Sequence, residues 1–192
     1  GFRDREEKAE MKPDAIFRIA SMTKPVVSLA IMMLAEEGKL SIAHPVSHYI
    51  AEFAKLQVGV EKKKDDGTVE LMLEPQARQM TVQDLLRHTS GLTYGVFDKS
   101  MVDDEYRKAG VLDRNQTTRG FIAKLMHLPL KHQPGTTWDY SVATDVLGWI
   151  VEVVSGKSVD DFIAERITKP LKMPDTGFFV EEKDGLYEVK PE

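Results

Sequence analysis

The sequence predicts an α+β domain in which helices predominate. Residues 26–35 and 143–154 are apolar segments of helical length, and each is followed within three residues by a glycine. Between them, apolar and polar residues alternate on both sides of an Asp-Asp-Gly turn, which indicates a β-hairpin. With 192 residues and 42% apolar content, the chain is long enough to enclose one hydrophobic core.

The first helix is expected to begin close to Ser21. Residues 26–35 are apolar except for Ser28, so this helix has no polar face and is predicted to be buried on all sides. Pro25 has no backbone N–H and is tolerated only within about the first turn, so the helix cannot begin much before Ser21. Ser21 therefore lies near the positive end of the helix dipole. Residues 36–38, which end in glycine, terminate the helix.

The middle of the chain changes from helical to strand periodicity. Residues 41–49, which include Pro45, are read as a short irregular connection. It leads to a further short segment near residues 50–56. Apolar residues then alternate at 58–60 and again at 69–73, around a turn at 65–67, and Pro75 ends the second strand.

Polar residues mark the helix starts of the second half. Thr81 is expected to cap a short helix, and the pair 117–118 begins another that ends before Pro129. An apolar-rich helix covers residues 143–154, and Ser158 caps a last one that runs to about residue 168.

Residues 93–116 show no clear periodicity and are left without a predicted element. Tyr94 and Phe97 in this stretch are candidate walls of a substrate pocket.

Composition excludes several classes of partner. The net charge of −5 argues against nucleic acid, and the basic run 62–64 is followed at once by two aspartates. The longest apolar stretch, within residues 26–35, is far shorter than the ~20 residues that a membrane span needs. The absence of cysteine removes disulfides, thiolate metal ligands and thiol nucleophiles.

No metal or cofactor site is expected. His44 and His48 have helical i, i+4 spacing, but no glutamate lies between them as in His-Glu-x-x-His, and Pro45 disrupts the turn. No glycine-rich phosphate loop is present. The nearest match to Gly-x-Ser-x-Gly, at residues 156–160, lacks the final glycine. His88 is interpreted as satisfying backbone groups in a turn.

Ser21 and Lys24 are the strongest candidates for catalysis. Ser21 is the only serine in the chain with a lysine three residues later, and the pair falls where a helix enters the core. One helical turn places the hydroxyl and the amine on the same face. Burial there would lower the pKa of Lys24 and let it take the serine proton. The alternative is a capping Ser21 beside a Lys24 on the surface.

Three segments together resemble the class C β-lactamase-like serine hydrolases. They are residues 14–39, residues 81–92 and residues 134–141, which follow the family's order and spacing over most of the chain. The family includes class C β-lactamases, penicillin-binding DD-peptidases, D-aminopeptidases and carboxylesterases. The resemblance implies the β-lactamase/DD-peptidase-like fold, represented mostly by its helical region.

The resemblance also implies roles for individual residues. Ser21 and Lys24 match the family's Ser-x-x-Lys motif, and Tyr140 matches the tyrosine of its Tyr-x-Asn motif. A free tyrosine is a poor base at neutral pH, but a neighbouring ammonium stabilises its phenolate, so Tyr140 would relay protons beside Lys24. The alternative for Tyr140 is a core aromatic with a hydrogen-bonded hydroxyl. Val142 replaces the family's asparagine in the substrate-binding region, which favours esters over lactams.

The resemblance covers only part of such a protein. The family's third motif, a Lys/His-Thr/Ser-Gly or Trp-Gly-Gly triplet, is absent, and the first strand is missing. Residues 1–192 are therefore expected to be a partial domain, inactive alone, whose sheet a missing C-terminal segment completes. Of the oxyanion donors, the backbone N–H of Ser21 remains, and losing one such donor typically costs ~100- to 1000-fold in rate.

The sequence therefore predicts a serine hydrolase that forms an acyl-enzyme on Ser21. Its substrate is expected to be a small-molecule ester or lactam, with a carboxylesterase favoured. A β-lactamase or D-amino-acid peptidase of the same family is an alternative. A non-catalytic binding or scaffold relative that keeps Ser21, Lys24 and Tyr140 is another.

Overall fold

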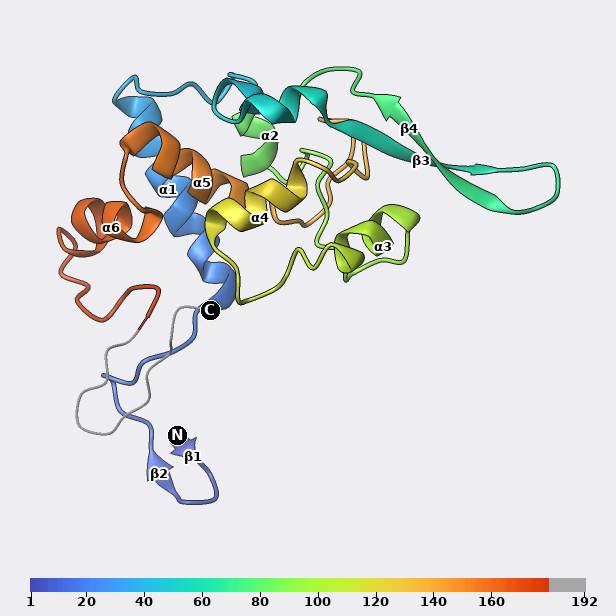
Figure 1. The fold of residues 1–192 in the computed structure, drawn as a ribbon. Helices are drawn as coiled ribbons and strands as arrows, with labels where there is room; N and C mark the ends of the chain where they lie inside the picture. The colour runs from blue at the N-terminus through green and yellow to red at the C-terminus, as the bar shows by residue number, and fades with distance from the viewer. Residues whose placement is uncertain (180–192) are drawn as a thin grey trace.

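The computed structural model describes residues 1–179 of the chain (Figure 1). In chain order the elements are β1 (Phe2–Asp4), β2 (Ala9–Glu10), η1 (Ala20–Met22), α1 (Thr23–Glu36), η2 (Val46–His48), η3 (Ala51–Lys55), β3 (Gln57–Lys63), β4 (Val69–Pro75), α2 (Val82–Leu86), α3 (Met101–Lys108), α4 (Thr118–Leu125), α5 (Ala143–Ser155), α6 (Val159–Ile163) and the π-helical turn η4 (Ala164–Thr168). The described part is thus mostly helical, with two small two-stranded sheets.

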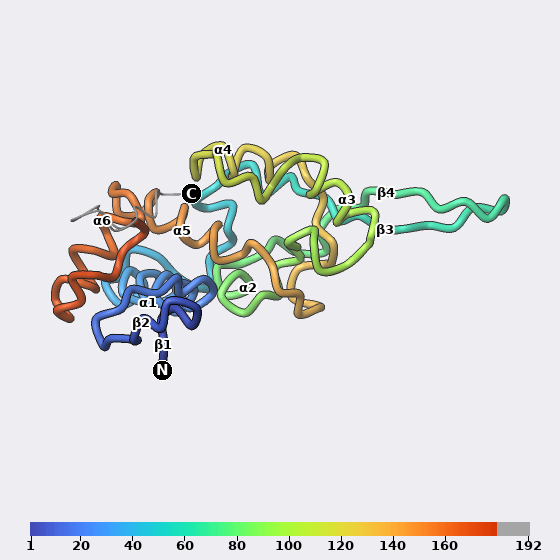
Figure 2. Tube along the Cα trace, turned by 90° about the horizontal axis from the view of Figure 1, so that it is seen from below, coloured from blue at the N-terminus to red at the C-terminus, as the bar shows by residue number. Residues whose placement is uncertain are grey.

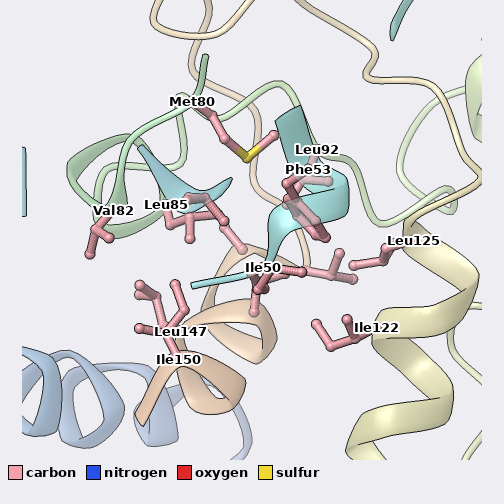
Figure 3. Packing of buried hydrophobic residues seen from close by; sticks show 14 of the residues in the cluster. Ile50, Phe53, Met80, Val82, Leu85, Leu92, Ile122, Leu125, Leu147 and Ile150 are labelled. Carbon is pink, nitrogen blue, oxygen red and sulfur yellow. The ribbon is translucent and has the colours of Figure 1, made fainter. Parts of the chain in front are cut away.

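The core lies around α5, which packs against α1, α2, α4 and α6. Side chains from segments far apart in the sequence meet there, as Figure 3 shows for Phe53, Leu85, Leu125, Leu147 and Ile150. The buried face of α5 includes Leu147 and Ile150, both with no exposed surface. Burying one such side chain contributes about 1.5–3 kcal/mol. The prediction of an apolar-rich helix over residues 143–154 is confirmed, and Gly156 ends it with φ of +70°.

The expectation that the first helix is buried on all sides is wrong. In α1, Val27, Ile31 and Leu34 face the core, but Leu29 and Met32 are 45% and 46% exposed. These two residues lie three positions apart, so they share one face of the helix. An uninterrupted apolar run therefore gives α1 two apolar faces, one packed against α5 and one open.

The predicted hairpin is present. Strands β3 and β4 pair antiparallel, with Val58 opposite Glu74 and Lys63 opposite Val69. The hairpin projects from the helical body in both views (Figures 1 and 2). Its base is fixed against α3, since a Cβ added at Gly59 would lie 2.5 Å from a methyl group of Val102. The second hairpin, β1–β2, lies apart from the helices in Figure 1.

The predicted helix caps are confirmed. The Thr81 hydroxyl accepts from the N–H of Asp84, the Thr117 side chain caps α4, and the Ser158 side chain caps α6. Helix α3 was not predicted. Its capping box, Ser100 with Asp103, is present in the sequence but falls in a stretch without apolar periodicity.

No helix in residues 1–179 is both long enough and apolar enough to cross a membrane.

Candidate active site

Ser21 lies in η1, the 3₁₀ turn that leads directly into α1. The preceding residue, Ala20, has φ of +44°, a left-handed conformation that costs a residue other than glycine about 1–3 kcal/mol. Ser21 itself is exposed. The N–H groups in the first turn of a helical segment have no acceptor within it, so they suit an oxyanion. The turn therefore presents the Ser21 hydroxyl at an open helix start.

The structure brings Ser21, Lys24 and Tyr140 together. The Ser21 Oγ and Tyr140 Oη atoms are 2.6 Å apart, although 119 residues separate them in sequence. The Lys24 Nζ atom donates to Ser21 Oγ at 3.3 Å. It also lies 4.6 Å from the centre of the Tyr140 ring. A serine hydroxyl, a phenol and an ammonium thus share one hydrogen-bonded cluster, which is the arrangement that proton transfer to and from a nucleophile requires.

The electrostatics of the cluster differ from the expectation for Lys24. Burial acts to lower the pKa of Lys24, but hydrogen bonds with Tyr140 and Tyr94 favour the ammonium, and its pKa is raised. The prediction of a lowered Lys24 pKa is therefore wrong, because the two tyrosines outweigh burial. By contrast, the hydrogen bonds of Tyr140 with Lys24 and Ser21 lower the pKa of its phenol. As the pH rises Tyr140 loses its proton before Lys24 does, so its phenolate is the available proton acceptor, and the Lys24 ammonium supplies the charge that stabilises it.

Tyr140 is held in place by pairing between two loops. The backbone of residues 88–91 bonds to that of residues 131–139: Asp139 N–H donates to His88 C=O at 2.9 Å and Gly135 N–H to Thr89 C=O at 2.7 Å. Gly91 has φ of +87°, and a Cβ there would lie 2.1 Å from the His132 carbonyl oxygen. The glycine is required because the two loops approach so closely.

His88 supports the same loop from its side chain. Its Nδ1 atom accepts from the Ser141 N–H at 3.3 Å, and its ring centre is 4.9 Å from that of Tyr140. Burial and the Lys24 ammonium lower the pKa of His88, so the ring stays neutral and able to accept. The interpretation of His88 as a residue that satisfies backbone groups is confirmed.

A buried carboxylate anchors the first of the two loops. Asp84 has no exposed surface and accepts from Arg78 at 2.6 Å, Arg87 at 3.1 Å and the Thr89 hydroxyl at 3.0 Å. Burial acts to raise its pKa, but the hydrogen bonds with Arg78 and Thr81 outweigh burial and hold the pKa well below its usual range. Asp84 therefore stays ionised and links α2 to the residues that position Tyr140.

The candidate substrate-binding residues separate into two groups. The Tyr94 and Phe97 rings lie 5.4 Å and 6.1 Å from the Tyr140 ring, beside the cluster. Val142 is 1% exposed and belongs to the hydrophobic core, where it precedes the first residue of α5. Its side chain is not presented to a ligand in this structure.

Two residues beside the cluster were missed by sequence reasoning. Trp138 is 65% exposed, and its ring stacks at 6.4 Å from that of Tyr140. Lys131 is 10% exposed and binds the carboxylates of Asp98, Asp103 and Asp139. The position of Trp138 two residues before Tyr140 was a usable signal for the first, whereas the partners of Lys131 are set only by the fold.

Residues 1–179 contain no group of three or more His, Cys, Asp or Glu side chains arranged to hold a metal ion.

Comparisons with known proteins cover nearly the whole chain. A family model described as Beta-lactamase matches residues 1–188. Protein Rv1367c of Mycobacterium tuberculosis is 40% identical over 181 residues, and Esterase EstB of Burkholderia gladioli is 33% identical over 188 residues. These matches cover 94% and 96% of this chain but only 43% and 44% of the relatives.

A solved structure is similar as well. The structure of EstCE1, described as a hydrolase with promiscuous acyltransferase activity, superposes with a TM-score of 0.77 at 28% identity. The match covers 94% of this chain and 44% of that one. The chain thus spans less than half the length of the relatives it matches.

Proposed function

Since the chain belongs to the Beta-lactamase family, we propose that the protein containing it is a serine hydrolase that forms an acyl-enzyme on Ser21 and cleaves small carboxylic esters. The single observation that carries the proposal is the 2.6 Å contact between Ser21 Oγ and Tyr140 Oη, with Lys24 Nζ 3.3 Å from the same serine. No other serine of residues 1–179 needs to be invoked.

The proposed reaction has two halves. In the first, ionised Tyr140 takes the Ser21 proton, and the serine oxygen attacks the ester carbonyl carbon. The Ser21 N–H stabilises the resulting oxyanion, and Tyr140 returns the proton to the departing alcohol. In the second half, Tyr140 takes a proton from water, whose oxygen attacks the acyl carbon. The bond between that carbon and Ser21 Oγ then breaks, Tyr140 returns the proton to Ser21, and the acid leaves. Lys24 stays charged throughout and stabilises the phenolate.

Ester substrates are favoured over lactams for two reasons. The buried Val142 stands where the resembling β-lactamases carry an asparagine, so position 142 offers no side-chain amide that could bind a lactam carbonyl. Relatives that match almost the whole chain include Esterase EstB and a lovastatin esterase of Penicillium rubens. A β-lactamase, a D-amino-acid peptidase and a non-catalytic scaffold are the alternatives that an experiment has to separate.

The proposed active site also needs an additional segment of polypeptide. The matched relatives are more than twice as long as the part aligned here. We expect a segment from that additional length to complete the sheet and supply the second oxyanion donor.

The test compares ester and lactam turnover in the protein that contains this chain. Short-chain aryl esters should be hydrolysed with a higher kcat/KM than a chromogenic cephalosporin. Ser21→Ala should abolish ester turnover, and Lys24→Met or Tyr140→Phe should each cost nearly as much, because residues that act as a unit are not additive. Higher turnover of the cephalosporin would favour the lactamase, and no turnover of either would favour the scaffold.

A further inference from the structure

Two exposed aromatic side chains lie beside the proposed catalytic tyrosine. Phe97 is 72% exposed and Trp138 is 65% exposed. Their ring centres are 6.1 Å and 6.4 Å from that of Tyr140. Large aromatic side chains dominate binding energetics when they are covered, and groups of them on a surface mark interaction sites.

The inner side of Tyr140 is already occupied by protein. The centres of the His88 and Tyr94 rings lie 4.9 Å and 5.4 Å from that of Tyr140, and both residues are partly buried. These two rings therefore account for the position of Tyr140. Phe97 and Trp138 pack on the outer side of these rings, 5.5 Å from Tyr94 and 6.3 Å from His88, and most of each side chain stays accessible to a ligand.

The ammonium of Lys131 binds the residues that directly follow both exposed rings. Asp98 follows Phe97 and Asp139 follows Trp138, and both carboxylates lie 3.1 Å from Lys131 Nζ. Asp103 of α3 is 3.2 Å from the same atom. The Lys131 side chain is only 10% exposed, so solvent screens these ion pairs less than it would on the surface.

The two loops have further polar anchors. Arg107 donates to the Asp98 carbonyl at 3.2 Å, and the Asp139 N–H donates to the His88 carbonyl. Although the rings are exposed, the backbones that carry them are fixed. Rings fixed before a ligand arrives lose less conformational freedom when it binds.

We propose that Phe97 and Trp138 form an aromatic subsite beside Ser21 and Tyr140, held by Lys131 as a positioning residue, which binds a planar aromatic group of the substrate. The inference rests on the proposed function and adds to it the class of substrate, an ester that carries an aryl or fused-ring group. Ring stacking is directional and needs no charge, so it selects flat apolar groups over small alkyl ones. The nearby Lys24 ammonium disfavours a cationic group.

The first experiment measures selectivity as the ratio of kcat/KM for 2-naphthyl acetate to that for ethyl acetate. Removing one stacked ring should lower this ratio about 2- to 12-fold, so Phe97→Ala and Trp138→Ala are each expected to do so. Val96→Ala is the matched control, because Val96 is a 52% exposed apolar residue of the same loop without a ring. It should leave the ratio unchanged.

The positioning role of Lys131 has its own variants. Lys131→Met should lower the ratio at least as much as the loss of one ring, whereas Lys131→Arg, which keeps the charge, should retain most of it. Because Lys131→Met leaves the buried Asp103 carboxylate without its cation, the exposed Asp98→Asn provides a variant less prone to unfold. It should lower the ratio by releasing only the Phe97 loop.

A binding measurement separates this inference from the proposed function. Calorimetric titration of 2-naphthyl acetate into the Ser21→Ala protein should show binding that Trp138→Ala weakens. If the wild type cleaves both esters and neither ring variant changes the ratio, the subsite is wrong and the hydrolase stands. If the wild type cleaves neither ester but the ring-dependent binding is observed, the hydrolase is wrong and the subsite stands. If the Ser21→Ala protein shows no ring-dependent binding, the subsite is again wrong.

Discussion

The hydroxyls of Ser21 and Tyr140 lie close enough for a proton to pass directly between them. Which of them holds it depends on Lys24. An ammonium beside a phenol favours the phenolate, and the phenolate in turn favours the ammonium, so the pKa of Tyr140 is lowered and that of Lys24 is raised. The two shifts come from the same interaction.

This coupling predicts the pH dependence of ester turnover. Activity should rise with pH as Tyr140 ionises, at a pH below the ordinary value for tyrosine, and fall when Lys24 loses its proton, above the ordinary value for lysine. In Lys24→Met the rising limb should move to higher pH, because the charge that lowers the Tyr140 pKa is gone. The measurement is kcat/KM against pH for both proteins, with Lys24→Met assayed at the higher enzyme concentration that its low residual turnover requires. An unmoved rising limb would show that Lys24 does not set the ionisation of Tyr140.

At the residue scale, the sequence was enough to identify the three catalytic candidates but not the protonation state of Lys24. The Ser-x-x-Lys spacing and the residues before Tyr140 were enough to select three side chains that lie together. Lys24 was expected to lose its charge on burial, because its two tyrosine partners are 70 and 116 residues away and could not be weighed. The burial of Val142 likewise depends on how α5 packs.

Between elements, the loop pairing behind Tyr140 depends on Gly91. An alanine there would adopt a left-handed φ and meet the His132 carbonyl at 2.1 Å, so Gly91→Ala should lower the free energy of unfolding by roughly 2 kcal/mol or more. Gly156 is the control, because it has φ of +70° but no atom within 4 Å of an added Cβ. Gly156→Ala should cost only about 1 kcal/mol.

Urea unfolding of the two variants provides the measurement. Equal losses in the two proteins would mean that the close approach at Gly91 is unimportant.

The elements themselves were largely predictable, since local signals determine them. The β3–β4 hairpin follows from alternation around an Asp-Gly turn, and α2, α4 and α6 follow from their capping residues. Helix α3 was missed because most of its residues are polar. Only a few of its side chains, such as Val102 and Tyr106, are buried, so the sequence shows no extended apolar face. What no local signal gives is the pairing of residues 88–91 with residues 131–139.

At the scale of the whole molecule, several large apolar side chains between residue 17 and the middle of α1 are exposed. Phe17 is 65% exposed and Met22 is 68% exposed, and Leu29 and Met32 are exposed as well. Such a surface favours association unless something covers it. We propose that a segment corresponding to the additional length of the relatives covers this surface.

Residues 1–192 expressed alone should therefore self-associate and show no ester turnover. Adding the segment that we propose completes the sheet, either in cis or as a second polypeptide, should restore both monomeric behaviour and activity. Light scattering and ester turnover check the two parts. A monomeric chain 1–192 with the turnover of the full protein would contradict this.

The central claim is that Ser21 is the acylated nucleophile. The most direct measurement is mass spectrometry of the full protein after treatment with a fluorophosphonate, which bonds covalently to an activated serine oxygen. We predict one adduct per protein, located on the peptide that contains Ser21, absent in Ser21→Ala and strongly slowed in Tyr140→Phe. An adduct that persists in Ser21→Ala, or no adduct in the active wild-type protein, would contradict the account.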